Sequence, residues 1–197
     1  MHTNDDDLRA ADAAAVRASA ALVARVTDDD LDRRTPCAAW DLKALVQHMT
    51  AQHRGFAAAA EGRGMDPAVW QTTPTAPVVA DHADAAEGVI KAFAAADMLD
   101  RPFAMPEFGA FPGRMVIGFH LVDYLVHGWD VARALDLPYQ PSPEVIALAR
   151  PIARAVPDGP DRLAAGAPFA PALAVASGAD ELDEILSLLG RDPRWRA

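Results

Sequence analysis

The sequence has a single cysteine, Cys37, more acidic than basic residues, and no apolar run long enough to span a bilayer. One cysteine excludes an intramolecular disulfide and any zinc site built from several cysteines. The longest apolar stretch, residues 119–126, is interrupted by His120 and Asp123, whereas a transmembrane helix needs about 20 apolar residues. Residues 1–8 are acidic and lack the basic start and apolar stretch of a secretory signal. We therefore expect a cytoplasmic protein without a membrane partner.

The charge balance excludes a further class of partner. The chain carries 18 lysine and arginine residues against 28 aspartate and glutamate residues, a formal net charge of −10. Binding to a nucleic-acid backbone requires clustered cationic residues, so we expect no nucleic-acid partner. With 197 residues, 51% of them hydrophobic, the chain is long enough to bury a core. We predict one main domain, residues 1–155, and a short C-terminal extension, residues 156–197, packed on it.

Apolar residues recur at helical spacing along most of the chain, which predicts an all-α fold. Asp41 is suited to be the N-cap of the clearest helix, which Gly62 terminates, and Ser142 followed by Pro143 marks another helix start. The helices predicted in the main domain cover residues 7–26, 42–61, 81–98, 114–135 and 143–155.

The remaining segments are less regular. Residues 101–113 contain three prolines and two glycines, which indicates a shaped loop rather than a helix. Residues 169–176 are compatible with one short strand. Asp180 is placed to cap a last helix that ends at Gly190 and Pro193. The C-terminal extension is therefore expected to be mostly helical.

Four polar side chains share one stripe of the helix predicted after Gly113. His120, Asp123, His127 and Asp130 are separated by three, four and three residues, and residues three or four apart are neighbours on a helix surface. One interpretation is a solvated groove or a buried Asp–His pair. The other is a metal site, because Asp123 and His127 at i and i+4 can converge on one ion.

His48 lies on the inward face of the helix that begins after Asp41. A lone histidine there is either a hydrogen-bonded core residue or a metal ligand supplied by a second helix. Together with Asp123 and His127 it would make a set of two imidazoles and one carboxylate. Such a set leaves coordination positions open, as in catalytic sites, and imidazole favours zinc or nickel over magnesium. The spacing alone leaves both interpretations open.

Further roles follow from position along the helix. Asp130 could accept the free ring N–H of His127, pair with Arg133, or be a solvated carboxylate near the helix end. His120 could line the cavity, serve as a proton carrier, or be a simple pocket or surface histidine. No pattern surrounds His53 or His82.

Three motifs stand out along the chain. The first is a Pro–Cys pair, a tryptophan that opens the helix and Leu-x-x-His; the second is an acidic residue four before a histidine, followed by Trp–Asp; the third is the ending LLGRDPRW. The residues involved are Pro36, Cys37, Trp40, Leu45, His48, Asp123, His127, Trp129, Asp130 and residues 188–195. With these motifs the chain resembles the mycothiol-dependent maleylpyruvate isomerase N-terminal domain family, which belongs to the DinB-like metal-binding proteins, and its actinobacterial short-chain branch in particular.

The resemblance implies a DinB-like four-helix bundle that holds one divalent metal ion through His48, Asp123 and His127. It also implies a thiol cofactor, mycothiol, and a transferase or isomerase acting on a small electrophile. The isomerases themselves carry Glu where this chain has Asp123, and they have a larger C-terminal domain, so maleylpyruvate is not implied as the substrate. A metal-dependent hydrolase and a non-catalytic ligand-binding protein with a structural metal are the alternatives.

Two expectations complete the sequence analysis. The alanine-rich first helix and the loop at residues 103–111 offer small and aromatic surfaces that could pair two chains, so we expect a homodimer. Cys37 lies in the turn before a helix, and we interpret it as a small buried residue rather than a nucleophile.

Overall fold

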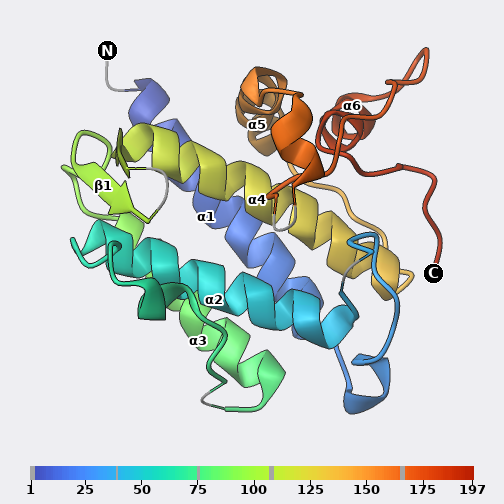
Figure 1. The fold of residues 1–197 in the computed structure, drawn as a ribbon, viewed down its shortest axis with the longest axis horizontal. Helices are drawn as coiled ribbons and strands as arrows, with labels where there is room; N and C mark the ends of the chain where they lie inside the picture. Colours follow the sequence, from blue (N-terminus) through green and yellow to red (C-terminus); the bar gives the residue numbers. More distant parts are fainter. Residues whose placement is uncertain (1–2, 39, 75, 107–108, 165–166) are drawn as a thin grey trace.

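A computed structural model describes residues 3–38, 40–74, 76–106, 109–164 and 167–197, with side chains from residue 7 onward. Four long helices form a bundle (Figure 1), which confirms the predicted all-α fold. Within the bundle α1 packs most extensively against α4, and α2 packs against α3. The four helices are α1 (Thr3–Val23), α2 (Leu42–Ala60), α3 (Val78–Phe93) and α4 (Gly113–Ala134).

Local signals set the helix ends as predicted. The Asp41 carboxylate accepts a hydrogen bond from the backbone N–H of Ala44, and Gly62, just beyond α2, has a φ of +81°, a value that glycine adopts without steric cost. Helix α3 ends five residues earlier than predicted, at Phe93. The turns that follow it are held by Arg9, whose guanidinium donates to the carbonyls of Ala94 and Ala95.

A β-hairpin occupies the segment predicted to be a loop. Strands β1 (Pro102–Met105) and β2 (Gly109–Pro112) pair antiparallel, with Phe103 opposite Phe111. Phe103 and Met105 are buried on one side of β1, which is the alternation of a half-buried strand. The three prolines led to the prediction of a loop, because proline cannot donate a hydrogen bond between strands and is found mainly at strand ends and on edge strands.

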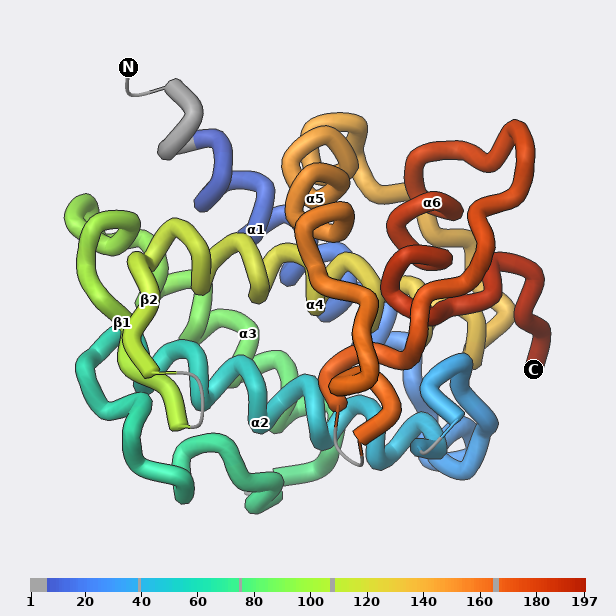
Figure 2. The backbone as a smooth tube through the Cα atoms, turned by 45° about the horizontal axis from the view of Figure 1, so that its top comes forward, coloured from blue at the N-terminus to red at the C-terminus, as the bar shows by residue number. Residues whose placement is uncertain are grey.

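The C-terminal part comprises α5 (Pro143–Ala155), the short 3₁₀ helix η3 (Pro160–Leu163) and α6 (Glu181–Leu188). Figures 1 and 2 show α5 and α6, in orange and red, on the side of α4 away from α3. Asp180 caps α6 as predicted. The strand predicted at residues 169–176 is wrong: these residues have no strand partner, and the side chains of Leu173 and Val175 are exposed.

Helix α4 is the centre of the fold. Most of its residues are buried, because α1, α2 and α5 all pack against it. Within the parts of the chain that the structure describes, no helix is both long and apolar enough to cross a bilayer.

The surfaces proposed for pairing two chains are largely internal. Ala11 and Ala15 of α1 are buried in the core, and so is Phe103 of the hairpin. Met115 and Phe119 of α4 remain exposed. The homodimer therefore stays a prediction.

Candidate metal centre

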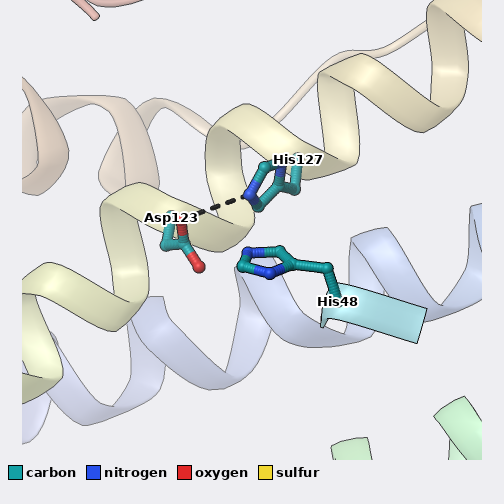
Figure 3. A group of neighbouring side chains, drawn as sticks. All are labelled: His48, Asp123 and His127. Atoms are coloured by element: carbon teal, nitrogen blue, oxygen red, sulfur yellow. Dashed lines mark ion pairs between the residues drawn. The ribbon is translucent and has the colours of Figure 1, made fainter. Parts of the chain in front are cut away.

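The three predicted ligands come together between α2 and α4. His48 projects from α2, and Asp123 and His127 project from successive turns of α4 (Figure 3). One ligand atom from each residue lies within 4.8 Å of the other two, and this is the one such group of three among the described residues. Both helices belong to the bundle, so their packing fixes the relative positions of the three side chains.

The spacing of the donor atoms suits a tetrahedral ion. The Oδ1 atom of Asp123 lies 3.4 Å from Nε2 of His127. Two donors that each lie about 2.1 Å from one ion at a tetrahedral angle are roughly 3.4 Å apart. Two imidazoles and one carboxylate also match the ligand preference of zinc and nickel. The residues present therefore fit a divalent transition metal.

An aromatic side chain covers one side of the centre. The ring of Trp40 lies 4.3 Å from that of His48 and 6.2 Å from that of His127, measured between centroids. The two histidine rings meet edge to face at 5.4 Å. Trp40 thus restricts rotation of His48, while Asp123 keeps 22% of its side-chain surface exposed. His48 and Asp123 are both half-buried and His127 is buried, so solvent reaches the centre at His48 and Asp123.

Burial keeps His48 neutral. Desolvation, with a smaller contribution from the neighbouring His127, lowers the pKa of His48 to about 4, although Asp123 opposes the shift. A neutral imidazole is the form that binds a metal. At neutral pH no proton has to leave His48 before a metal can bind.

Asp130 fixes the orientation of His127. Its Oδ2 lies 3.0 Å from Nδ1 of His127, so a hydrogen bond from Nδ1 leaves Nε2 free to face Asp123. This agrees with the first of the roles considered for Asp130. Among the described residues, the ion pairs of Asp130 are with His127 and Arg191 and not with Arg133, whose guanidinium lies 5.4 Å from the Trp129 ring centroid. The cation at Asp130 is Arg191, with Nη2 3.1 Å from Oδ2.

Arg191 also keeps Asp130 ionised. Burial alone would raise the pKa of Asp130, but the positive charge of Arg191 and the hydrogen bond from His127 hold it below its usual range. Sequence analysis missed Arg191 because it lies 61 residues from Asp130. The one available signal was its position inside the C-terminal motif at residues 188–195.

His120 is not part of the centre. It follows the same stripe, but seven residues span about 10 Å of helix axis, which places it deeper in the bundle. Its ring is fully buried, with Nδ1 2.7 Å from Oδ1 of Asp12 and Nε2 3.2 Å from Nδ1 of His53. The interpretation of His120 as a surface histidine is therefore wrong, and the other roles considered for it stay predictions.

A second polar cluster, built on all four bundle helices, surrounds His120. We call its members the histidine cluster: Asp12, Thr50, His53, His82 and His120. The rings of His53 and His82 are 5.2 Å apart, and Nδ1 of His82 lies 3.2 Å from Oγ1 of Thr50. The absence of a sequence pattern around His53 and His82 was misleading, because their partners come from other helices.

The hydrogen bonds of the histidine cluster define its tautomers. Thr50 donates to the carbonyl of Val46, so its oxygen accepts from Nδ1 of His82. At the other end the Asp12 carboxylate accepts from Nδ1 of His120, whose Nε2 then accepts from Nδ1 of His53. The Nε2 atoms of His53 and His82 are left as lone pairs, both buried without a protein partner in the described structure. Protonation of either ring would therefore place an unpaired N–H in the core.

Cys37 is poorly suited to be a nucleophile. Burial raises the pKa of its thiol to about 11, against the opposing charge of Arg191, whose Nη2 donates to the sulfur at 3.5 Å. A rise from the ordinary 9.0 lowers the thiolate fraction about 100-fold near neutral pH.

We expect alkylation of the folded protein by iodoacetamide at pH 8 to be about 100-fold slower than in urea, as measured by mass spectrometry. Equal rates would show that Cys37 is exposed and reactive.

The fold and the site together define a helical bundle with a two-histidine, one-aspartate candidate metal centre. The family model of the mycothiol maleylpyruvate isomerase N-terminal domain matches residues 13–132, so this chain belongs to that family. Two Mycobacterium tuberculosis proteins, the uncharacterized proteins MT0763 (strain CDC 1551) and Rv0738 (strain H37Rv), are each 31% identical to it over 183 residues. Each match covers 90% of this chain and 93% of the relative. No solved structure gives a significant match.

Proposed function

We propose that the protein binds one divalent metal ion, zinc or nickel, through His48, Asp123 and His127. We further propose that it uses the ion to activate mycothiol, or a similar small thiol, for transfer to or isomerisation of a small electrophile. The observation that carries the proposal is that three donor atoms lie within 4.8 Å of one another. The chain also belongs to a family that is named after mycothiol maleylpyruvate isomerase.

Each residue of the site has a separate task in this proposal. A bound divalent ion supplies a Lewis acid that lowers the pKa of a coordinating thiol. His48 and His127 are the neutral donors, and Asp123 adds a negative charge on the accessible side. Asp130 holds the tautomer of His127, and Trp40 keeps solvent from one side. Three protein ligands leave room for a thiol to approach from the side of Asp123.

The properties of Cys37, the thiol of this chain, favour a reacting thiol that comes from solution. Cys37 is half-buried, its pKa is raised to about 11, and Arg191 lies against its sulfur. A thiol in that state is protonated at neutral pH and is a weak nucleophile. Thiol chemistry at this site therefore requires a small thiol from solution.

Cobalt substitution tests the proposal, because Co²⁺ takes the geometry of zinc and has a visible spectrum. We expect titration of the cobalt-loaded protein with mycothiol to produce an intense sulfur-to-metal charge-transfer band and to release protons. S-methylated mycothiol is the matched control ligand and should give no band. The Asp123→Glu variant should retain the band, because it restores the residue that the isomerases carry.

Other outcomes of the titration would favour other functions. A cobalt spectrum that mycothiol leaves unchanged would contradict the thiol-dependent reaction. Hydrolytic activity without added thiol would then indicate a metal-dependent hydrolase, and loss of folding on metal removal would indicate a structural metal.

A further inference from the structure

Arg191 follows α6, far beyond the family match at residues 13–132, yet its side chain reaches the candidate metal centre. Its side chain is only 5% exposed. Nη2 lies 3.1 Å from Oδ2 of Asp130, and Nε lies 3.4 Å from Oδ1. The guanidinium therefore contacts both carboxylate oxygens, and Oδ2 is also the atom that His127 contacts through Nδ1 at 3.0 Å.

We infer that Arg191 is a positioning residue of the metal centre, through which the C-terminal segment determines metal affinity. The inference rests on the proposed binding of a metal by His127. A buried carboxylate held by one hydrogen bond can rotate, whereas a two-point contact with a planar guanidinium fixes both of its oxygens. Asp130 fixed in this way holds the His127 ring with Nε2 directed at the other ligands.

The backbone around Arg191 is itself held in place. Gly190 has a φ of +77°, and a Cβ atom there would lie 2.6 Å from the carbonyl oxygen of Ala170, so only glycine fits. The amide of Arg191 donates to the carbonyl of Leu186 at 2.8 Å, and its Nη1 donates to the carbonyl of Leu189 at 3.3 Å. The backbone at the end of α6 thus directs the Arg191 guanidinium towards Asp130, and Gly190 permits that backbone conformation.

Positioning and simple charge predict different results for Arg191→Lys. If Arg191 acts only through its positive charge, this variant should bind metal as the wild type does. If Arg191 positions Asp130, the lysine variant loses the two-point contact despite keeping the charge, and its metal affinity falls.

The test measures the zinc dissociation constants of wild type and Arg191→Lys by competition with a chromophoric chelator. We expect Arg191→Lys to bind zinc about tenfold more weakly, the lower end of the range for partners of ligating histidines. The matched control is Arg194→Lys. Arg194 lies in the same C-terminal segment, but its side chain is 89% exposed and its ion-pair partner is Asp192 rather than Asp130. That variant should stay within about twofold of wild type.

The possible results separate this inference from the proposed function. A dissociation constant of Arg191→Lys within about twofold of wild type would overturn the positioning role and leave the metal site intact. Failure of the wild type to bind zinc would overturn the proposed function and this inference with it.

A measurement on the wild type keeps the inference testable if Arg191→Lys does not fold. If docking of the C-terminal segment raises the affinity for zinc, bound zinc must favour docking of the segment by the same factor, because such coupling is reciprocal. We expect the amides of residues 189–191 to exchange with deuterium about tenfold more slowly in saturating zinc. Val89 of α3 serves as the internal reference, whose exchange should not change. Equal exchange at residues 189–191 with and without zinc would overturn the inference.

Discussion

Replacing His48, Asp123 or His127 by alanine should each weaken zinc binding by more than roughly a hundredfold. The reason is that each change removes one of three donors, whereas even an outer partner of a ligating histidine contributes about 10- to 100-fold. The purified wild type should carry about one metal ion per chain by emission spectroscopy. Each single variant should therefore be purified with much less metal than the wild type.

The controls for these substitutions lie outside the centre. Asp84 is an exposed aspartate on α3, and Asp84→Ala should retain full metal occupancy. Circular dichroism should show that all variants remain helical. Full occupancy in all three ligand variants would place the metal elsewhere and contradict the assignment.

Mild acid should destabilise the protein through the histidine cluster. Burial lowers the pKa of His82 to about 4 and that of His53 well below its usual value. An unfolded histidine, with a pKa near 6.5, therefore takes up a proton at a pH where the folded one does not, and acid favours the unfolded state. The stabilisation is complete above pH 6.5 and is lost as the pH falls towards 4. For His82 alone the loss is roughly 3 kcal/mol.

Urea unfolding between pH 7 and pH 4 measures this effect. A chelator should be present throughout, so that release of bound metal at low pH does not contribute. His82→Gln is the matched variant, because its side-chain amide can still donate to Thr50 but does not titrate in this range. Its free energy of unfolding should fall by roughly 3 kcal/mol less than that of wild type across the window. Identical pH dependence in the two proteins would show that His82 does not titrate on unfolding.

The helices of the bundle could be predicted because their determinants are local. Asp41, Ser142 and Asp180 each cap a helix from within three residues of the amide they bind. The helical register that follows fixes the relation between Asp123 and His127 before any tertiary contact is known. His48, the third candidate ligand, could be predicted through the family resemblance, since spacing alone left it as either a core residue or a ligand.

The features that were missed depend on how distant segments pack. Asp12 and His120 are 108 residues apart, and Arg191 reaches Asp130 from beyond α5, η3 and α6. No periodicity in one segment reports such a contact. His120 shares the stripe of Asp123 and His127, so sequence spacing grouped them, but the length of the helix places His120 among the core residues of α1 and α2.

The most direct test of the proposed metal centre is a crystal structure of the zinc-loaded protein with anomalous data collected at the zinc absorption edge. The proposed site predicts one strong anomalous peak between α2 and α4, at about 2.0–2.2 Å from Nε2 of His127, a ring nitrogen of His48 and a carboxylate oxygen of Asp123. A peak bound by other residues, or no peak after growth in excess zinc, would contradict the assignment.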